Sequence, residues 1–279
     1  MARATSGKDP LAKLSGAIVL VGAGKMGAAL LDGWLARRLD PRKLIVLEPQ
    51  PAKSIKALTR RGARLNPKAR AGDVAAVVIA VKPQVAPEVV PPLASLVGRN
   101  TVVISIMAGR TLAFLERALP GAAIVRAMPN TPAAIGRGIT VLVANARVSA
   151  GGRKLAQALL AAAGKVEWAA DEALMDAVTA VSGSGPAYVF LLAEALARAG
   201  VAAGLPAELA EKLARETVAG SGELLHRSDL AAALLRQNVT SPGGTTAAAL
   251  DVLMAADGLD PLLTRAVAAA TRRGKDLAG

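Results

Sequence analysis

The sequence predicts an α/β protein in which a doubly wound parallel β-sheet is followed by an all-α domain. Short apolar runs alternate with helical segments up to about residue 168, as is typical of strands that are buried on both faces. From Asp171 to the end no convincing strand follows, and long Ala- and Leu-rich segments have helical spacing. Hydrophobic residues make up 53% of the 279 residues, which is ample apolar material for two domains.

The expected strands are short apolar runs that end in glycine, proline or polar residues. The first run, Ala17 to Val21, is followed by a helical pattern from Gly24 to Arg38. A basic helix follows the second strand and extends through Arg60, and another helix begins at Leu112. The other expected strands are Leu44 to Leu47, Ala75 to Val81, Val102 to Ile106, Ile124 to Ala127 and Ile139 to Val143.

The composition excludes several kinds of catalytic and binding site. Cysteine is absent, so disulfides, thiolate metal sites and cysteine nucleophiles are ruled out. The single histidine, His226, rules out a multi-histidine metal site and argues against a Ser-His-Asp triad. We interpret His226 as a surface or packing residue, and we expect no metal.

The formal charge of +13 does not by itself indicate a nucleic-acid partner. The basic residues are scattered, and the aromatic residues that would stack on exposed bases make up only 2% of the chain. A positive field that attracts small anions, such as a dinucleotide and a carboxylate substrate, accounts for the charge better. We therefore expect small-molecule ligands and no nucleic acid.

The location and assembly of the chain are predicted from its apolar and polar runs. Residues 1–15 are mixed polar and basic, which predicts a disordered leader, not a secretory signal. Apolar stretches are interrupted by Gly, Pro or charge, so we expect no transmembrane helix, no membrane partner and a cytoplasmic protein. The high apolar content of the helical half predicts burial against a second copy, and hence a homo-oligomer.

A glycine motif of the type G-x-G-x-x-G follows the first strand and begins the first helix. Gly22 allows a tight turn, Gly24 lets the backbone approach a pyrophosphate, and Gly27 lets the helix pack on the strand. The pyrophosphate would lie against the N-terminus of the helix, where free N–H groups and the dipole favour negative charge. The predicted dinucleotide-binding residues are Gly22, Ala23, Gly24, Lys25, Met26 and Gly27.

The acidic residue Glu48 ends the second strand, about 20 residues after the glycine motif, which is typical of a Rossmann-like domain. Its carboxylate would accept hydrogen bonds from the adenosine ribose and repel a 2′-phosphate. We therefore favour NADH over NADPH. Lys53, Lys56 and Arg60 follow closely and could compensate for the negative charge, so NADPH stays an alternative.

Three further loops follow predicted strands and so are expected at the carboxyl edge of the sheet, where open α/β folds bind ligands. Lys82-Pro83 ends the third strand, and Ser105 to Gly109 ends the fourth. Met128, Pro129 and Asn130, with Thr131-Pro132, form a rigid polar loop that we interpret as a wall for the nicotinamide and the substrate.

The order of these motifs resembles that of pyrroline-5-carboxylate reductases over about Ala17 to Leu253. The most specific match is N-V-T-S-P-G-G-T-T, from Asn238 to Thr246. The other matching blocks are G-A-G-K-M-G, A-V-K-P (Ala80 to Pro83), S-I-M-A-G, R-A-M-P-N-T-P (Arg126 to Pro132) and V-S-G-S-G-P-A-Y (Val181 to Tyr188). Three positions depart from the family: Lys25 replaces a common Asn or Gln, Gly185 a frequent Ser, and Glu48 more neutral or phosphate-binding residues.

The resemblance implies an NAD(P)H-dependent oxidoreductase that transfers hydride to C5 of 1-pyrroline-5-carboxylate and gives L-proline, the last step of proline biosynthesis. It implies a dinucleotide-binding domain at 16–168 and a helical substrate-binding and dimerisation domain at 169–279, with homodimers that often form rings. Val81, Lys82, Pro83 and Ala108 would contact the dinucleotide. Residues of the signature loop would hold the substrate: Asn238, Ser241, Gly243, Gly244, Thr245 and Thr246.

The chemistry of the signature loop agrees with a carboxylate site, because it presents backbone N–H groups and hydroxyls at the start of a helix from Thr246 to Leu253. A capping turn alone is the alternative. A protonated imine is already electrophilic, so a strong general acid is unnecessary, and Thr246 is the candidate catalytic residue, hydrogen-bonded to the ring nitrogen. We interpret Tyr188 as a packing residue.

Two other functions would fit parts of the pattern. Another Rossmann-plus-helical reductase, such as a β-hydroxyacid dehydrogenase or an imine reductase, usually has a lysine or aspartate on the helix that joins the domains. Residues 171–179 offer acids and no lysine. A non-catalytic dinucleotide sensor would have no use for a carboxylate-binding loop.

Overall fold

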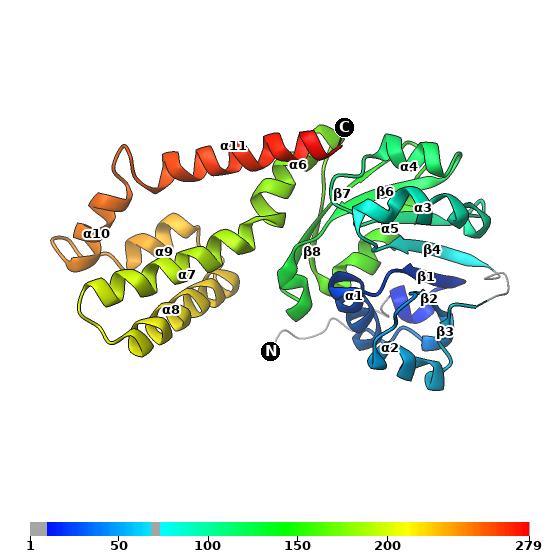
Figure 1. Cartoon of the computed structure of the whole chain (residues 1–279), viewed down its shortest axis with the longest axis horizontal. Helices are drawn as coiled ribbons and strands as arrows, with labels where there is room; N and C mark the ends of the chain where they lie inside the picture. Colours follow the sequence, from blue (N-terminus) through cyan, green and yellow to red (C-terminus); the bar gives the residue numbers. More distant parts are fainter. Residues whose placement is uncertain (1–9, 68–72, 279) are drawn as a thin grey trace. The chain divides into compact units, whose positions relative to one another are not determined.

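The computed structural model describes residues 10–67 and 73–278, and their contacts divide the chain into two compact units (Figure 1). The sheet unit runs to Gly183 and takes in the C-terminal residues from Arg272, and the helical unit is Ser184–Thr271. Of the expected leader, residues 1–9 lie outside the described part. Pro10–Lys13 form a 3₁₀ turn, and Leu11 and Leu14 are buried, so the expected leader already joins the core here.

The sheet has eight strands in the order β3-β2-β1-β4-β5-β6-β7-β8. Neighbouring strands are parallel except for β6 and β7, which pair antiparallel, so the sheet is mostly parallel. All six predicted strands are present, whereas β3 and β8 were not predicted. The bounds are β1 Ala17–Val21, β2 Leu44–Leu47, β3 Arg64–Leu65, β4 Val74–Ile79, β5 Val102–Ser105, β6 Ala123–Met128, β7 Gly138–Ala144 and β8 Gly164–Trp168.

Helices cover both faces of the sheet, as a doubly wound fold requires (Figure 1). Ile18 and Leu20 of β1 belong to a core with α1, α2 and α5, while Val19 belongs to a second core with α3 and α4. The sheet therefore separates two apolar layers, and the alternation of side chains along each strand supplies both. The bounds are α1 Lys25–Ala36, α2 Lys53–Ala57, α3 Ala86–Val89, α4 Leu112–Ala118 and α5 Ala150–Leu160.

The order in which the strands are connected creates a topological switch point between β1 and β4. The chain builds β1, β2 and β3 outward on one side and returns to place β4 on the other side of β1. The carboxyl ends of β1 and β4 lie at this change of direction, where open α/β sheets bind ligands. The fold thus fixes the edge at which the glycine motif lies.

The helical unit buries very little of its own apolar surface. Among its described residues only Ala210 and Ala214 are buried, both on α8. Large apolar side chains stay exposed, among them Phe190 at 62% and Val252 at 72%. The helices are α7 Gly185–Ala202, α8 Ala207–Arg227, α9 Ala232–Asn238, α10 Thr245–Leu253 and α11 Leu259–Ala278, whose last turns belong to the sheet unit.

One helical run, Glu172–Ala202, is long and apolar enough to cross a membrane by length and composition, with a mean hydropathy of 1.3. The sequence did not point to this run, because Gly183, Gly185 and Pro186 interrupt its apolar residues. The run is not one α-helix. It comprises a 3₁₀ turn at Glu172–Leu174, α6 at Met175–Val178, a π-helical turn at Thr179–Gly183, and α7.

Candidate functional site

The glycine motif forms a tight turn at the carboxyl end of β1. Gly22 has φ +88° and donates its N–H to the Leu47 carbonyl at 2.8 Å. A Cβ on Gly27 would lie 2.4 Å from the Gly22 carbonyl oxygen, so only glycine allows α1 to begin this close to the turn. Gly24, by contrast, is exposed, and a Cβ there would meet no atom within 4 Å. These are the conformations that the three proposed glycine roles need.

The start of α1 is open to a negatively charged group. Gly24 is the N-cap and supplies no side chain, and the first turn of the helix contains no acidic residue. The first N–H groups of the helix therefore lack side-chain acceptors, and their partial positive charge favours an anion. Lys25, the first helical residue, is exposed and adds a cation at the same end, while Met26 packs against the core.

Glu48 lies against the glycine turn. Its Oε2 accepts a hydrogen bond from the Ala23 N–H at 2.8 Å, and its Oε1 accepts one from the Gln50 N–H at 3.0 Å. Asn66 holds the backbone of Glu48 from the other side through two hydrogen bonds of 2.9 and 2.8 Å. The carboxylate is thus fixed beside the turn, at the end of β2 where the sequence placed it. The bond to Ala23 and the role of Asn66 were not predicted.

The ends of β1, β4 and β5 are joined by further backbone hydrogen bonds. Ala80 donates its N–H to Val21 at 2.7 Å, and Ile106 donates to Ile79 at 3.0 Å. The A-V-K-P and S-I-M-A-G turns therefore start side by side at the carboxyl edge. Lys82 and Ala108 are exposed there, while Val81 and Pro83 are half-buried.

Arg110 connects these two turns and was not predicted from the sequence. Its Nε and Nη2 both donate to the Pro83 carbonyl, at 3.0 and 2.7 Å, and its guanidinium lies 4.7 Å from the centre of the Phe114 ring. Arg110 directly follows the glycine of S-I-M-A-G, and this adjacency is the signal that could have identified it. The residue fixes the spacing of two loops that we expect to contact the dinucleotide.

The loop Met128 to Asn130 continues from β6. Asn130 accepts a hydrogen bond on Oδ1 from the Ile139 N–H at 2.9 Å, which ties the loop to β7. Pro129 is buried and Met128 is half-buried. A Cβ on Gly183 would lie only 2.6 Å from Met128 Cε, so Gly183 provides room for that methionine.

The signature loop lies in the helical unit. Asn238 is the last residue of α9, and the loop turns through a Gly244 N–H to Ser241 carbonyl bond of 3.0 Å with Gly243 at φ +69°. Helix α10 then begins at Thr245, with Gly244 as an N-cap that supplies no side chain. The structure thus groups the predicted residues Ser241, Gly243, Gly244, Thr245 and Thr246 at one helix N-terminus. Its open N–H groups can receive a carboxylate.

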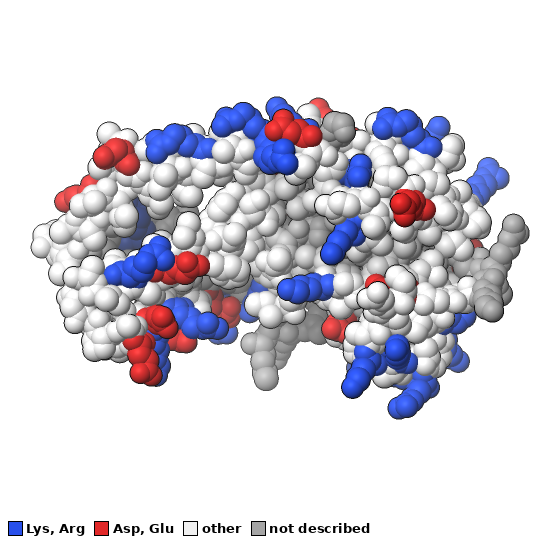
Figure 2. Space-filling view, in the orientation of Figure 1, with Lys and Arg blue, Asp and Glu red and all other residues white. Residues whose placement is uncertain are grey.

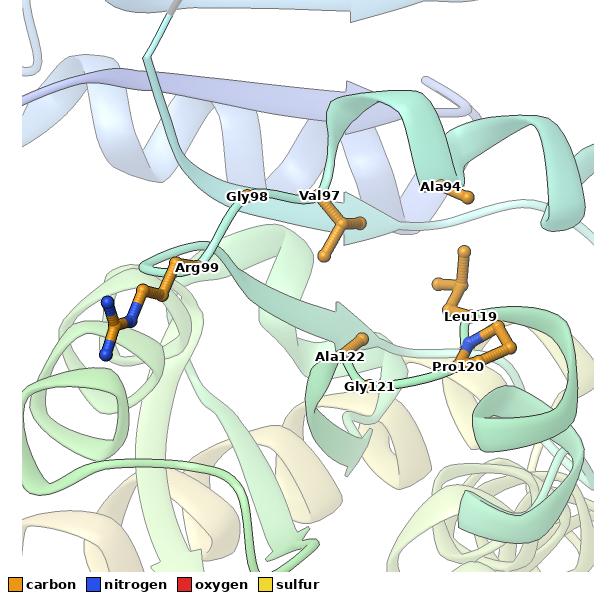
Figure 3. A pocket seen from close by; sticks show the side chains of 8 residues that line it. All are labelled: Ala94, Val97, Gly98, Arg99, Leu119, Pro120, Gly121 and Ala122. Atoms are coloured by element: carbon orange, nitrogen blue, oxygen red, sulfur yellow. The ribbon is translucent and has the colours of Figure 1, made fainter.

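A shallow pocket of about 230 Å³ lies away from all of these residues (Figure 3). It is formed by segments that precede β5 and β6, and so belongs to the amino edge of the sheet. No predicted site residue lines it, and the guanidinium of Arg99 points away from the other lining side chains (Figure 3). Within residues 10–67 and 73–278, no cluster of three or more His, Cys, Asp or Glu could hold a metal ion.

Comparison with known proteins adds to this geometry. The chain is 43% identical over 263 residues to the pyrroline-5-carboxylate reductase of Synechocystis sp., a match that covers 92% of this chain and 97% of the relative. The chain belongs to the pyrroline-5-carboxylate reductase family. The pyrroline-5-carboxylate reductase of Pseudomonas aeruginosa is 40% identical, over 94% of this chain and 96% of its own length. A family model for pyrroline-5-carboxylate reductase dimerisation matches residues 172–277.

Solved structures of the same family have the same fold. The reductase from Coxiella burnetii superposes with a TM-score of 0.87 at 34% identity, over 95% of this chain and all of that one. The Plasmodium falciparum reductase, solved with NADP bound, superposes at 0.77 with 30% identity over 95% of this chain and 99% of that one. A model named NADP oxidoreductase coenzyme F420-dependent matches residues 17–109.

Together these matches settle fold and activity. The chain is an NAD(P)-dependent oxidoreductase of the pyrroline-5-carboxylate reductase type, with a dinucleotide-binding sheet domain followed by a helical dimerisation region. The β-hydroxyacid dehydrogenase and sensor alternatives are therefore set aside. The exposed apolar residues of α7 to α11 have an explanation as well, because a dimerisation region leaves its interface uncovered in a single chain.

Proposed function

We propose that this reductase transfers a hydride from a reduced nicotinamide to C5 of 1-pyrroline-5-carboxylate and releases L-proline. The observation that carries this is that the chain has two open helix N-termini, that of α1 for a pyrophosphate and that of α10 for a carboxylate. Both are N-capped by glycine, so each leaves backbone N–H groups to a ligand. A cytoplasmic location, and the further association of dimers into a ring, stay predictions.

The dinucleotide would lie along the carboxyl edge of the sheet. Its pyrophosphate would meet Gly22 to Gly27, where the exposed Gly24 lets the backbone come close. Its nicotinamide half would reach the turns that Arg110 links, and Asn130 would form part of the wall. The proposed contacts there are Val81, Lys82, Pro83, Ala108, Met128, Pro129 and Asn130.

We propose that NADH is preferred to NADPH, with Glu48 as the reason. Its carboxylate is fixed beside the glycine turn, where it would accept bonds from ribose hydroxyls and repel a 2′-phosphate. Lys53, Lys56 and Arg60 act against this preference, since they are exposed on the segment after β2. Figure 2 shows basic side chains gathered near α2 and β3. The balance of these charges sets how strong the preference is.

The substrate would bind through its carboxylate to the first turn of α10, with Asn238 nearby at the end of α9. Gly243, at φ +69°, permits the turn that aims the N–H groups of Thr245 and Thr246 at the carboxylate. An arginine is unnecessary at such a site, because a helix N-terminus already supplies donors and partial positive charge.

The reaction needs positioning more than acid catalysis. The bound imine is protonated, so hydride adds to C5 and the electron pair of the C=N bond becomes the lone pair of the ring nitrogen. The Thr246 hydroxyl would hydrogen-bond to this nitrogen and orient the ring without protonating it. When bound, the nicotinamide supplies the hydride. The protein contributes by holding C5 at the correct distance and excluding water.

Product analysis tests this proposal. Enzyme, reduced nicotinamide with deuterium at both C4 positions and 1-pyrroline-5-carboxylate should give L-proline with one deuterium at C5, identified by mass spectrometry and chiral chromatography. Proline without deuterium, or deuterium at another carbon, would contradict direct hydride transfer to C5.

A further inference from the structure

A buried arginine lies beneath α4. Arg126 is in β6, and its side chain is only 5% exposed. Its neighbours Val125 and Ala127 face the core of α1 and α5, while Ile124 faces the core of α3 and α4. Since side chains alternate along a strand, Arg126 shares the face of Ile124. A cation in this apolar layer needs a charged partner close by.

That partner is Glu172. Its Oε1 lies 2.7 Å from Arg126 Nη1 and also accepts a hydrogen bond from the Leu112 N–H at 2.8 Å. Leu112 is the first residue of α4, so the carboxylate also meets the positive end of that helix. One carboxylate oxygen therefore joins a strand, a helix N-terminus and the 3₁₀ turn in which Glu172 lies.

Two of the three joined segments adjoin loops assigned above to the nicotinamide. Arg126 is two residues before Met128, and Leu112 is two residues after Arg110. The first part of the run that starts at Glu172, before α7, ends at Gly183, which provides room for the Met128 side chain. Glu172 thus anchors one end of a run whose other end packs on the Met128 loop.

The last turns of α11 meet the same run and the same turn. A Cβ on Gly274 would lie 3.3 Å from the Asp176 carboxylate, and a Cβ on Gly109 would lie 3.5 Å from the Leu277 carbonyl oxygen. The two nicotinamide loops, the run 172–183 and the end of α11 therefore form one packed cluster within the sheet unit. The ion pair between Glu172 and Arg126 is the charged contact within this cluster.

We infer that Glu172 is a positioning residue for hydride transfer. By binding both Arg126 and the N–H of Leu112 at one oxygen, it fixes the loops after β5 and β6 relative to each other. These loops in turn determine the position of the nicotinamide ring. This role rests on the proposed placement of the dinucleotide. It differs from a role in stability alone, because it changes the rate of the chemical step in molecules that remain folded.

The test is a single-turnover experiment on the full-length enzyme. Enzyme in excess is mixed with limiting NADH and saturating pyrroline-5-carboxylate, and loss of the reduced nicotinamide is followed by stopped-flow absorbance. The rate constant reports positioning, whereas the melting temperature and the stoichiometry of NADH binding report the fraction of folded molecules. The variants are Glu172→Gln, which keeps an acceptor oxygen, and the double variant Arg126→Met/Glu172→Leu, which leaves no unpaired buried charge. Glu167→Gln, at an exposed position of β8, is the matched control.

We expect the rate constant to fall roughly 10- to 100-fold in the double variant, as for a small misplacement of reacting groups. The rate constant of Glu172→Gln should lie between those of the double variant and the unmodified enzyme. The rate constant of Glu167→Gln should equal that of the unmodified enzyme. Dissociation constants for NADH should stay within about threefold, because the glycine turn is untouched. A lower melting temperature or a lower stoichiometry of NADH binding, with an unchanged rate constant, would overturn the positioning role. An unmodified enzyme that is folded and binds NADH but leaves pyrroline-5-carboxylate unreduced would instead overturn the proposed function.

Discussion

The carboxylate of Glu48 accepts a hydrogen bond from the backbone N–H of Ala23, at 2.8 Å, and so joins the end of β2 to the glycine turn after β1. The residue expected to select the cofactor is thus also part of the scaffold of the turn. A substitution here has two effects that must be separated, one on the shape of the turn and one on the charge that a ribose or a phosphate meets.

Glu48→Gln separates these effects, because glutamine keeps an oxygen that can accept from Ala23 while it removes the charge. We expect the ratio of kcat/KM for NADPH to that for NADH to rise about tenfold, equivalent to about 1.4 kcal/mol of relieved repulsion. Steady-state kinetics with both cofactors give the ratio. Glu88→Gln, at an exposed site on α3, should leave it unchanged. An unaltered ratio in Glu48→Gln would assign cofactor choice to other residues.

The glycine turn offers a matched pair of substitutions. In Gly27→Ala the new Cβ would lie 2.4 Å from the Gly22 carbonyl, so we expect the free energy of unfolding to fall by about 1–3 kcal/mol. In Gly24→Ala the Cβ meets no atom within 4 Å, so stability should change by less than about 1 kcal/mol.

Dinucleotide affinity should distinguish the same two positions. Gly24→Ala places a methyl group where the pyrophosphate is expected, and NADH affinity should drop at least about tenfold in a well-folded protein. Denaturant unfolding and calorimetric NADH titration measure the two effects. A Gly24→Ala protein that binds NADH normally would show that the pyrophosphate lies elsewhere.

Removal of the Thr246 hydroxyl tests the signature loop. We expect Thr246→Ala to lower kcat/KM for pyrroline-5-carboxylate by roughly 10- to 1,000-fold, as for loss of one well-placed hydrogen bond. Thr246→Ser keeps the hydroxyl and should retain most of the activity. The dissociation constant for NADH should hardly change, since this residue is assigned to the substrate. Wild-type kinetics in Thr246→Ala would rule out the proposed bond to the ring nitrogen.

The uncovered apolar surface of the helical unit predicts that assembly depends on it. Phe190 is 62% exposed on α7, and a charge there would oppose burial against a second copy. Phe190→Glu should reduce the molar mass measured by light scattering, whereas Lys212→Glu, at an exposed polar position on α8, should preserve it. An unchanged mass in Phe190→Glu would place the interface on another face.

The sequence predicted the central strands well because apolar runs buried on both faces are hard to mistake. It missed β8, whose sequence Gly164–Trp168 alternates charged and apolar residues at the sheet edge, and β3, which has only two residues. The long-range charged contacts were equally inaccessible. Nothing local indicates that Arg126 points beneath α4 and meets Glu172, 46 residues later in the chain.

The site residues likewise fall into those that local sequence patterns identify and those that they do not. Motif residues could be found because a glycine turn and a Ser-Pro-Gly-Gly-Thr-Thr loop have characteristic local patterns, and the loop does lead into a helix at Thr245. Residues that support the motifs, such as Asn66 behind Glu48 and Arg110 between two turns, act through contacts that only the folded chain creates.

The most direct measurement of the proposed reaction is the oxidation of NADH and of NADPH by the purified enzyme, with and without 1-pyrroline-5-carboxylate. We predict rapid turnover that depends on this substrate, with a higher kcat/KM for NADH than for NADPH. Folded protein that binds dinucleotide yet oxidises neither cofactor when pyrroline-5-carboxylate is added would contradict the assigned reaction.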